Sequence, residues 1–309
     1  MQPLHPPSFR SPDRLPLQQS PFYGRALRLL GAEVRQVWLQ DGGKCWGQAL
    51  LLRRGWRGLG VTACLRGPLW QGDPSPELRA GLLAGLRRET GLLLIQPEGA
   101  DTPTQGLPLA GGRDLAILPL RDPVAQRRAF SRSWRNHLCR GETSGLGIES
   151  LNPAAEDLDW ILAADRRQQH QKGYRALPAR FVLAWAAANP GAMRLYRARA
   201  GRDVVAAALF LLHRPWASYH VAVSLPAARN MEAHRLILWH AMQELRSEGC
   251  DTLDLGVAEA SNPGLAAFKR DTGARLETSG RSVLVLPPRR GRPAFLLGPL
   301  RGRPGTGSR

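Results

Sequence analysis

The stretch RNMEAHRLILWHAMQELRSEGCDTLDLGVAEASNPGLAAFKRDTG, residues 229–273, decides the fold of this chain. Apolar residues recur at three- and four-residue steps from Ala233 to Leu245, which predicts a long amphipathic helix. Gly249 stands where a left-handed residue would end that helix. Apolar and polar residues alternate in residues 250–257, and this pattern predicts a strand with one buried face.

A turn and a short helix follow this strand. The tetrapeptide SNPG, residues 261–264, is typical of a turn. Residues 265–272 then predict a short helix that Gly273 closes. This short helix carries the pair Phe268-Lys269.

Length and composition place the chain among ordinary globular proteins. Its 309 residues are more than a single hydrophobic core usually contains, so two domains or one duplicated domain are expected. No apolar run approaches the roughly 18 residues that a membrane span needs. Residues 1–21 are rich in proline and have no apolar core of a signal peptide, so we expect a flexible segment and a cytoplasmic protein.

The sequence suggests no metal site. Its 4 cysteines are scattered without any CxxC pairing, which favours small buried side chains over disulfides or zinc ligands. His234 and His240 share the predicted long helix but lack the HExxH spacing of a zinc site.

The formal charge of +18 indicates an anionic partner, but composition can also produce it. The basic residues are 40 Arg and 3 Lys, a bias that a GC-rich genome explains equally well. The segment from residue 287 to 309 has six Arg and no acidic residue, so we expect a disordered basic tail. The remaining charge would attract tRNA, nucleotide-linked substrates or anionic lipid headgroups without selecting one of them.

One order of elements occurs twice along the chain: three strands, a helix and a further strand. The first set comprises strands at 33–39, 45–53 and 60–65, a helix at 76–88 and a strand at 92–96. The second comprises strands at 194–200, 204–212 and 217–223, the long helix and the strand at 250–257. This repetition predicts an α/β fold with mixed sheets in two halves, each with the element order of GNAT (N-acetyltransferase-like) domains.

Three motifs resemble those of the FemABX family, aminoacyltransferases built from two GNAT-type domains. Arg66-Gly67-Pro68 looks like the family's RGP motif, Arg135-Asn136 looks like its R-N element, and residues 264–269 (GLAAFK) are similar to its G-L-x-x-F-K element. The resemblance covers both halves and suggests five segments. These are a flexible 1–21, a first GNAT-like domain at 22–121, a linking basic helix at 122–150, a second GNAT-like domain at 151–286 and the tail at 287–309.

The resemblance implies transfer of an acyl or aminoacyl group from an activated ester to an amine, by direct attack and without a covalent intermediate. In this family the lysine of the F-K element, here Lys269, is the candidate for stabilising the oxyanion, and Phe268 stands beside it. The implied donor is aminoacyl-tRNA or acyl-CoA, and no permanently bound cofactor is expected. The implied acceptor is a small-molecule, nucleotide-linked or lipid-linked amine, such as a peptidoglycan precursor.

Further candidates come from the residues themselves, each with a plain structural alternative. Asp254 faces opposite to Leu253 and Leu255, so it can orient the amine or satisfy backbone donors. Tyr219 and His220 can line the site, but one of them must point to the other face of the sheet.

Three basic side chains complete the candidates. Arg66 can bind phosphate or complete a surface turn before Pro68. Arg135 belongs to a basic helix after Asp122 that can form a wall beside a phosphate-bearing substrate or a solvated face. Lys172 is one of the few lysines in an arginine-rich chain, which suggests a need for a compact ammonium or chance retention.

Two departures from the family leave alternatives open. Thr272 stands where the family usually has an aromatic residue, and the helical arm of some cell-wall members is absent. Residues 227–233 (AARNMEA) also lack the glycines that cradle a CoA pyrophosphate, and Glu232 adds a negative charge there. One alternative is an acetyl-CoA-dependent N-acetyltransferase. The other is a non-catalytic binding module, which would bind RNA, or would bind an anionic membrane through the basic tail.

Overall fold

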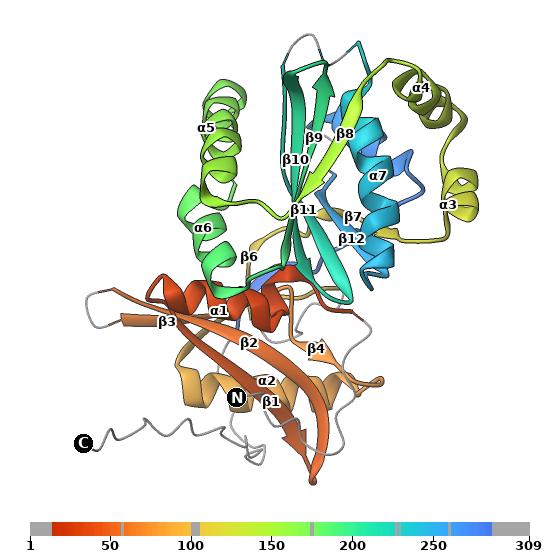
Figure 1. The fold of residues 1–309 in the computed structure, drawn as a ribbon. Helices are drawn as coiled ribbons and strands as arrows, with labels where there is room; N and C mark the ends of the chain where they lie inside the picture. Colours follow the sequence, from red (N-terminus) through yellow and green to blue (C-terminus); the bar gives the residue numbers. More distant parts are fainter. Residues whose placement is uncertain are drawn as a thin grey trace. The chain divides into compact units, whose positions relative to one another are not determined.

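The computed structural model describes residues 14–56, 59–99, 106–173, 176–225, 228, 230–258 and 261–285. These residues form two compact units. The first unit contains the described residues of 32–112 and 279–285, together with Arg14, and the second contains those of 15–31 and 113–278 (Figure 1). The predicted tail at 287–309 and the residues before Arg14 lie outside the described part of the chain.

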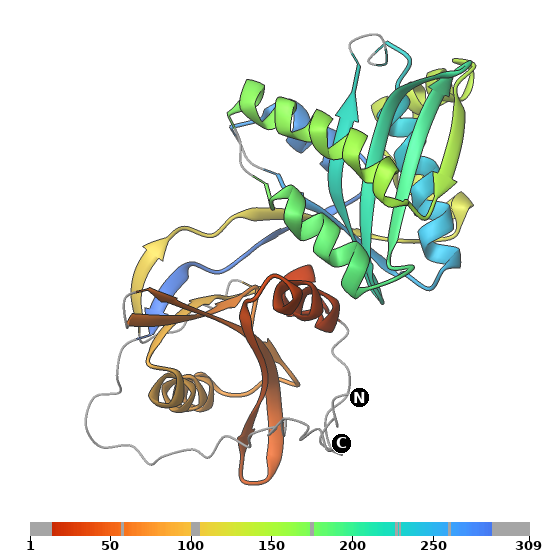
Figure 2. The ribbon, with the colours of Figure 1, turned by 60° about the vertical axis from the view of Figure 1, so that its left-hand side comes forward.

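The first unit is built on a mixed sheet. Seven strands among its described residues take the order β1-β2-β3-β5-β14-β6, with β4 paired to β2. Their bounds are β1 Glu33–Asp41, β2 Lys44–Trp56, β3 Leu59–Leu65, β4 Leu69–Trp70, β5 Leu92–Gln96, β6 Gly106–Ala110 and β14 Ser282–Val285. Strands β3 and β5 run parallel and are connected through α2, Pro76–Thr90. Figure 2 shows α2 against one face of this sheet, where Leu82, Leu86 and Ile95 are buried in one core.

The second unit repeats this plan. Seven strands among its described residues take the order β13-β7-β12-β11-β10-β9-β8. Their bounds are β7 Asp114–Pro119, β8 Gly147–Leu151, β9 Met193–Ala200, β10 Asp203–His213, β11 Trp216–Ser224, β12 Thr252–Val257 and β13 Arg275–Thr278. Strands β11 and β12 run parallel and are connected through α7, Ala233–Ser247.

Helices cover both faces of the second sheet. On one side lie α5, Ala155–Lys172, and α6, Ala179–Ala188 (Figure 1). On the other side lie α7, α3, Pro123–Ala129, and α4, Arg132–Glu142 (Figure 1). The largest core of this unit joins α7 to the sheet through residues such as Ile237, Leu253 and Phe210. The predicted α/β fold with two tandem GNAT-like units is therefore confirmed.

The N-terminal helix belongs to the second unit, whereas residues 22–121 were predicted to form the first domain. This helix, α1, Pro21–Leu29, follows the short 3₁₀ helix η1, Leu17–Gln19, and Ser20 caps it by accepting from the Tyr23 N–H at 3.2 Å. Its aromatic side chains pack on α6, with Tyr23 and Phe181 ring centroids 5.3 Å apart. Leu15 and Leu17 are buried as well, so residues 15–21, which were predicted to be flexible, are an ordered part of this unit.

Strand pairing also moves the predicted domain boundaries. Strand β7 lies within the predicted first domain but pairs with β12 of the second sheet, where Leu253 faces Leu118. Strand β14 lies within the predicted second domain but pairs with β5 of the first sheet, where Val283 faces Ile95. The backbone hydrogen bonds of these two strands assign them to units that their sequence positions do not indicate.

The predicted linking helix at 122–150 is in fact two helices and a strand of the second unit. Phe130 has extended backbone angles (φ −66°, ψ 146°) and ends α3. The Ser131 side chain accepts from the Trp134 N–H at 3.0 Å and starts α4. Residues 147–151 form the edge strand β8, which pairs with β9. No helix in the described part of the chain is long and apolar enough to cross a membrane.

Candidate functional site

The site lies where the parallel strands β11 and β12 separate. Their pairing runs from Trp216 opposite Thr252 to Ser218 opposite Asp254, and no pair beyond this occurs among the described residues. Both strands nevertheless continue, β11 to Ser224 and β12 to Val257. Open α/β sheets bind ligands beyond the carboxyl ends of their parallel strands, so the side chains near Asp254 are the first candidates.

Asp254 is buried, with 4% of its surface exposed, and faces away from the large core that holds Leu253 and Leu255. Its Oδ1 accepts a hydrogen bond from the Gly256 N–H at 2.7 Å. The carboxylate therefore satisfies a backbone donor, which is the structural alternative foreseen from the sequence. This contact also fixes the carboxylate at the level where the strands separate.

Gly256 shapes the end of β12. Its φ of +75° lies in the left-handed region, where a side chain is strained. Four residues of β12, 254–257, oppose three residues of β7, 115–117, because Asp254 pairs with Ile117 and Val257 pairs with Leu115. The Val257 carbonyl group lies at the end of this bulge.

Lys269 reaches this bulge from α8, Pro263–Arg270. Its Nζ donates to the Val257 carbonyl oxygen at 2.7 Å, and only 6% of the residue is exposed. The same Nζ would lie 3.8 Å from a Cβ placed on Gly256. The structure thus brings the two predicted catalytic side chains, Asp254 and Lys269, to one short segment of β12.

The position of α8 is fixed at both ends. The Asn262 side chain accepts from the Leu265 N–H at 3.2 Å and starts the helix. Thr272 is fully buried, and its Oγ1 donates to the Lys269 carbonyl at 2.6 Å. Thr272 therefore secures the helix end by a hydrogen bond, where the FemABX pattern has an aromatic residue.

Phe268 lies half-buried beside Lys269. Its ring centroid is 6.4 Å from that of Trp134 on α4. The Arg235 guanidinium carbon lies 5.4 Å from the same ring, which is a cation–π distance. The Phe268 ring thus connects α8 to α4 and to the first turn of α7.

Tyr219 and His220 point to opposite sides of the second sheet. The Tyr219 ring packs against Phe210 at 5.2 Å within the core on the α7 side. The His220 ring lies 6.1 Å from Phe181 on α6. A register shift between Leu209 and Phe210 places His220 in a bulge two residues beyond the last β11–β12 pair.

The imidazole of His220 is neutral at pH 7, because burial lowers its pKa to about 4. Its Nε2 is buried and has no hydrogen-bond partner among the described residues. Burial also raises the pKa of Tyr219, so its hydroxyl keeps its proton. Neither side chain carries charge to this part of the sheet.

One polar pair was not anticipated from the sequence. His213 is fully buried at the end of β10, and its Nε2 lies 2.9 Å from the Oγ of Ser218. Ser218 is the register partner of Asp254, so this pair adjoins the point of separation. In the sequence, the only feature that could have pointed to this pair was the histidine at the end of the apolar run VVAAALFLLH, residues 204–213.

Two of the predicted binding residues have other surroundings. Arg66 belongs to the first unit, has a φ of +51°, and forms a buried bidentate ion pair with Glu98 at 2.6 and 2.8 Å. This pair gives Arg66 a structural role in its turn, and the turn is buried rather than at the surface. Lys172 is exposed at the last residue of α5. Burial, with a contribution from the Lys172 charge, lowers the pKa of His234 to about 4.

Arg135 is anchored at the C-terminal end of α3. Its Nη1 donates to the carbonyl of Phe130 at 2.6 Å and to that of Arg128 at 3.3 Å. Arg135, a residue of α4, also lines an open pocket together with residues of α3 and with Trp239 of α7. The contacts of Arg135 are therefore different from those that bring Asp254 and Lys269 to β12.

The N-terminus of α7 holds a carboxylate of the protein itself. Glu232 has a φ of +54°, a rare conformation for a residue with a side chain, and forms an ion pair with Arg235. One oxygen of the same carboxylate lies 3.9 Å from the Nδ1 of His137. A pyrophosphate bound at the N-terminus of α7 would meet this negative charge. No group of side chains suited to a metal ion occurs among the described residues.

Known proteins resemble this chain in part of its sequence and in its fold. Residues 126–270 match the family model described as an acetyltransferase (GNAT) domain. The structure of FemX superposes with a TM-score of 0.72 at 15% identity, covering 90% of this chain and 94% of that chain. The C-terminal domain of a putative lysylphosphatidylglycerol synthetase from Agrobacterium fabrum gives 0.52 at 16% identity, covering 87% and 88%.

L-PGS from Bacillus licheniformis is similar to the same degree, with a TM-score of 0.52 at 16% identity and coverage of 85% and 87%. The search of curated proteins gave no match. At these sequence identities, the similarity to solved structures shows a shared fold only. The residues matched by the family model lie in the second unit.

Proposed function

We propose that the chain transfers an aminoacyl group from an activated ester to an amine, because residues 126–270 match a GNAT domain model and the fold resembles that of FemX. The GNAT match supports acyl transfer in general. The observation that carries the finer proposal is the convergence of Lys269 and Asp254 on residues 254–257, where β11 and β12 separate.

The proposed reaction is direct attack. The acceptor amine adds to the ester carbonyl, a C–N bond forms, and the carbonyl oxygen becomes negatively charged. The C–O bond of the ester then breaks, and the leaving oxygen takes up the proton released by the amine. Positioning and electrostatic stabilisation are the two contributions that the protein supplies.

Each of the two side chains has a role in this proposal. The buried Lys269 ammonium stabilises the developing oxyanion, because a charge in a poorly solvated site interacts strongly. Asp254 is a carboxylate at the level of strand separation, and it accepts a hydrogen bond from the amine while the Gly256 N–H holds it in place. Phe268 keeps α8 against α4, so it positions Lys269 through the helix.

Replacing Asp254 with asparagine tests the second role. The amide oxygen can still accept from Gly256 N–H, so the fold is expected to persist, but the negative charge is lost. We expect turnover to fall about tenfold to a hundredfold, since the loss of a hydrogen bond to a charged group costs about 1.5–3 kcal/mol. The measurement is the rate of transfer of radiolabelled aminoacyl groups from a charged tRNA pool to a panel of amines. Unchanged turnover would leave Asp254 with its structural hydrogen bond alone.

The N-terminus of α7 supports the choice of donor in this proposal. Acyl-CoA enzymes hold a pyrophosphate there through backbone N–H groups, and such close approach needs glycine. In this chain Glu232 and Arg235 form an ion pair at that place instead. We therefore propose an aminoacyl-tRNA donor, for which the basic surface of the chain supplies attraction.

Ligand binding separates this donor from acetyl-CoA. We expect millimolar acetyl-CoA to leave the melting temperature nearly unchanged, and charged tRNA to bind with steep salt dependence, since each neutralised phosphate releases counterions. A ligand at about 100 times its dissociation constant would add roughly 2.7 kcal/mol, enough for a shift of several degrees. Thermal unfolding with acetyl-CoA and filter binding with tRNA at several salt concentrations are the measurements.

The outcomes distinguish the three functions. Stabilisation by acetyl-CoA without tRNA binding would replace the proposal with an N-acetyltransferase, which the description of the matching family model favours. Binding of tRNA without any transfer to an amine would indicate the non-catalytic binding module.

A further inference from the structure

An open pocket of about 600 Å³ lies on the α3–α4 side of α7. Its lining residues are Pro123, Val124, Arg127, Arg128, Arg135 and Trp239. We call it the α3–α4 pocket. A volume of this order suits a small organic ligand. The transfer chemistry proposed above makes no use of this pocket.

Two of the pocket's guanidinium groups are fixed by the protein. Arg127 forms a bidentate ion pair with Glu142, with both N–O distances at 2.7 Å. Arg135 donates from Nη1 to two carbonyls at the end of α3. These anchors fix the guanidinium positions before a ligand arrives, so less side-chain entropy is lost on binding.

The third guanidinium is not engaged. The side chain of Arg128 has no hydrogen bond, ion pair or ring contact with any other part of the chain that the structure describes. Among residues 123–142 there are five arginines and one acidic residue, Glu142, which Arg127 already neutralises. The pocket therefore carries positive charge that no carboxylate of these two helices balances.

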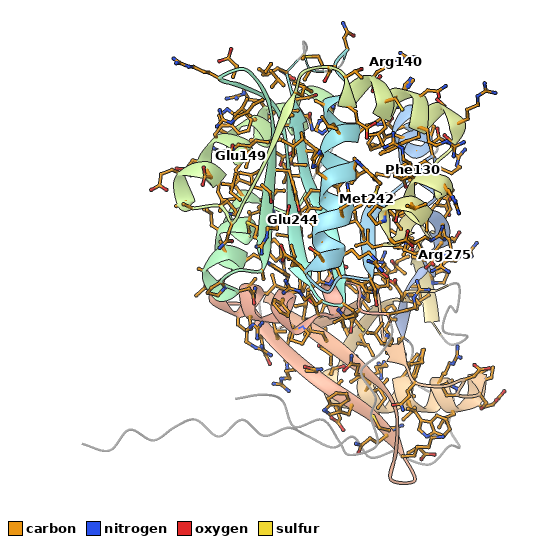
Figure 3. All side chains as sticks on the ribbon, turned by 45° about the vertical axis from the view of Figure 1, so that its right-hand side comes forward. Phe130, Arg140, Glu149, Met242, Glu244 and Arg275 are labelled. Carbon is orange, nitrogen blue, oxygen red and sulfur yellow. The ribbon has the colours of Figure 1, made fainter. Side chains whose placement is uncertain are left out.

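An aromatic wall adds an apolar surface to this charge. Trp239 is 8% exposed, and the Arg127 guanidinium carbon lies 5.7 Å from its ring centroid. Phe130 makes an edge contact with Trp239 at 5.6 Å and packs against Trp134 at 4.2 Å. Figure 3 labels Phe130 beside α7 and Arg140 on α4. Since Trp134 contacts Phe268, this aromatic series links the pocket to the helix of Lys269.

We propose that the α3–α4 pocket binds a phosphate group of a phosphorylated ligand. Phosphate offers three oxygens to guanidinium groups that approach from Arg128 and Arg135, and arginine pairs with such groups in two parallel hydrogen bonds. The tryptophan wall suits an apolar or planar part attached to the phosphate. The phosphate can come from a free phosphorylated compound or from a phospholipid headgroup.

The test measures binding without turnover, so it does not depend on the proposed reaction. Inorganic pyrophosphate is titrated into the full chain by calorimetry at low salt. Vesicles of phosphatidylcholine with and without phosphatidylglycerol are tested in parallel by sedimentation. Arg128→Gln is expected to weaken binding of the effective probe about tenfold, the size of one charge-assisted hydrogen bond.

Arg140→Gln is the matched control, because Arg140 is an exposed arginine of the last turn of α4 that does not line the pocket. We expect it to change affinity less than about twofold, since a single distant surface charge contributes little. Pyrophosphate binding with this pattern identifies a soluble ligand, and vesicle binding with this pattern identifies a lipid headgroup. Absence of binding to both probes, or equal weakening by the two substitutions, would overturn the proposal. Far-ultraviolet circular dichroism of Arg128→Gln checks that the fold is unchanged.

Discussion

Replacing Lys269 with methionine is expected to lower turnover about 10²- to 10³-fold while KM stays nearly constant. The ammonium acts on charge that appears only in the transition state, so its loss reduces kcat rather than substrate affinity. Methionine keeps most of the aliphatic stem and therefore fills the same buried space. Steady-state kinetics with charged tRNA as donor and the best amine acceptor measure both constants.

The neighbouring Arg270 supplies the control. It lies on the same helix, is exposed and is also basic, so Arg270→Met removes a nearby charge without touching Val257. We expect this variant to keep turnover within about twofold, as for surface substitutions generally. Equal losses in both variants, or none in Lys269→Met, would contradict the oxyanion role and leave Lys269 as a partner of the Val257 carbonyl.

A loss of Lys269 also has a structural component that must be separated from catalysis. The Val257 carbonyl would lose its donor at 2.7 Å, and an unpaired buried polar group costs about 1–3 kcal/mol. Turnover is therefore compared at a temperature where unfolding curves show that both variants are folded. The catalytic loss is the part that persists in fully folded protein.

Replacing Gly273 with alanine is expected to lower the free energy of unfolding by about 3 kcal/mol. Gly273 has a φ of +82°, and a side chain in this region costs about 1–2 kcal/mol. Its added Cβ would also lie 2.8 Å from the carbonyl oxygen of Ala129, closer than contact allows, and relief of such crowding costs about 1–3 kcal/mol. With about 2–4 °C per kcal/mol for a unit of this size, the melting temperature should fall by roughly 6–12 °C.

Gly264, in the first turn of α8, supplies the control for Gly273. A Cβ there meets nothing within 4 Å, and its φ lies outside the left-handed region. Gly264→Ala should therefore leave stability unchanged or raise it by up to about 1 kcal/mol, because alanine favours helix. Thermal unfolding of both variants measures the contrast, and equal stability would show that α8 and α3 adjust freely to a larger residue at 273.

The close approach at Gly273 also bears on the candidate site. The Ser131 N–H donates to the Asp271 carbonyl at 2.9 Å, so the chain after α8 is attached to the start of α4. Displacement of Gly273 would shift this attachment and with it the helix of Lys269. We therefore expect Gly273→Ala to lower activity even in the molecules that remain folded.

Local sequence patterns determined much of the second unit. The apolar periodicity predicted α7 and the alternation predicted β12. The short helix predicted at 265–272 is α8, but it begins at Pro263 after the Asn262 cap and ends at Arg270, two residues before the predicted end. These features depend on residues a few positions apart, because capping, turn geometry and helix periodicity are local interactions. The repeated order of strands and helices followed from the same patterns, and the tandem GNAT-like fold followed from that order.

The tertiary structure alone decided which distant segments pair. Strands β7 and β14 are short and apolar, so their patterns fit either sheet, and only hydrogen bonds to β12 and β5 assign them. The helix α1 likewise reads as amphipathic without indicating that α6 is its partner.

The candidate site shows the same division. The residue types of Asp254 and Lys269 were evident from the sequence, and Asp254 was correctly placed opposite Leu253 and Leu255 by the alternation of a strand. The sequence did not predict three features of the site: the bulge at Gly256, the contact of Lys269 with Val257 and the pairing of Ser218 with His213. Each depends on chain segments brought together only by folding, whose relative positions no local periodicity specifies.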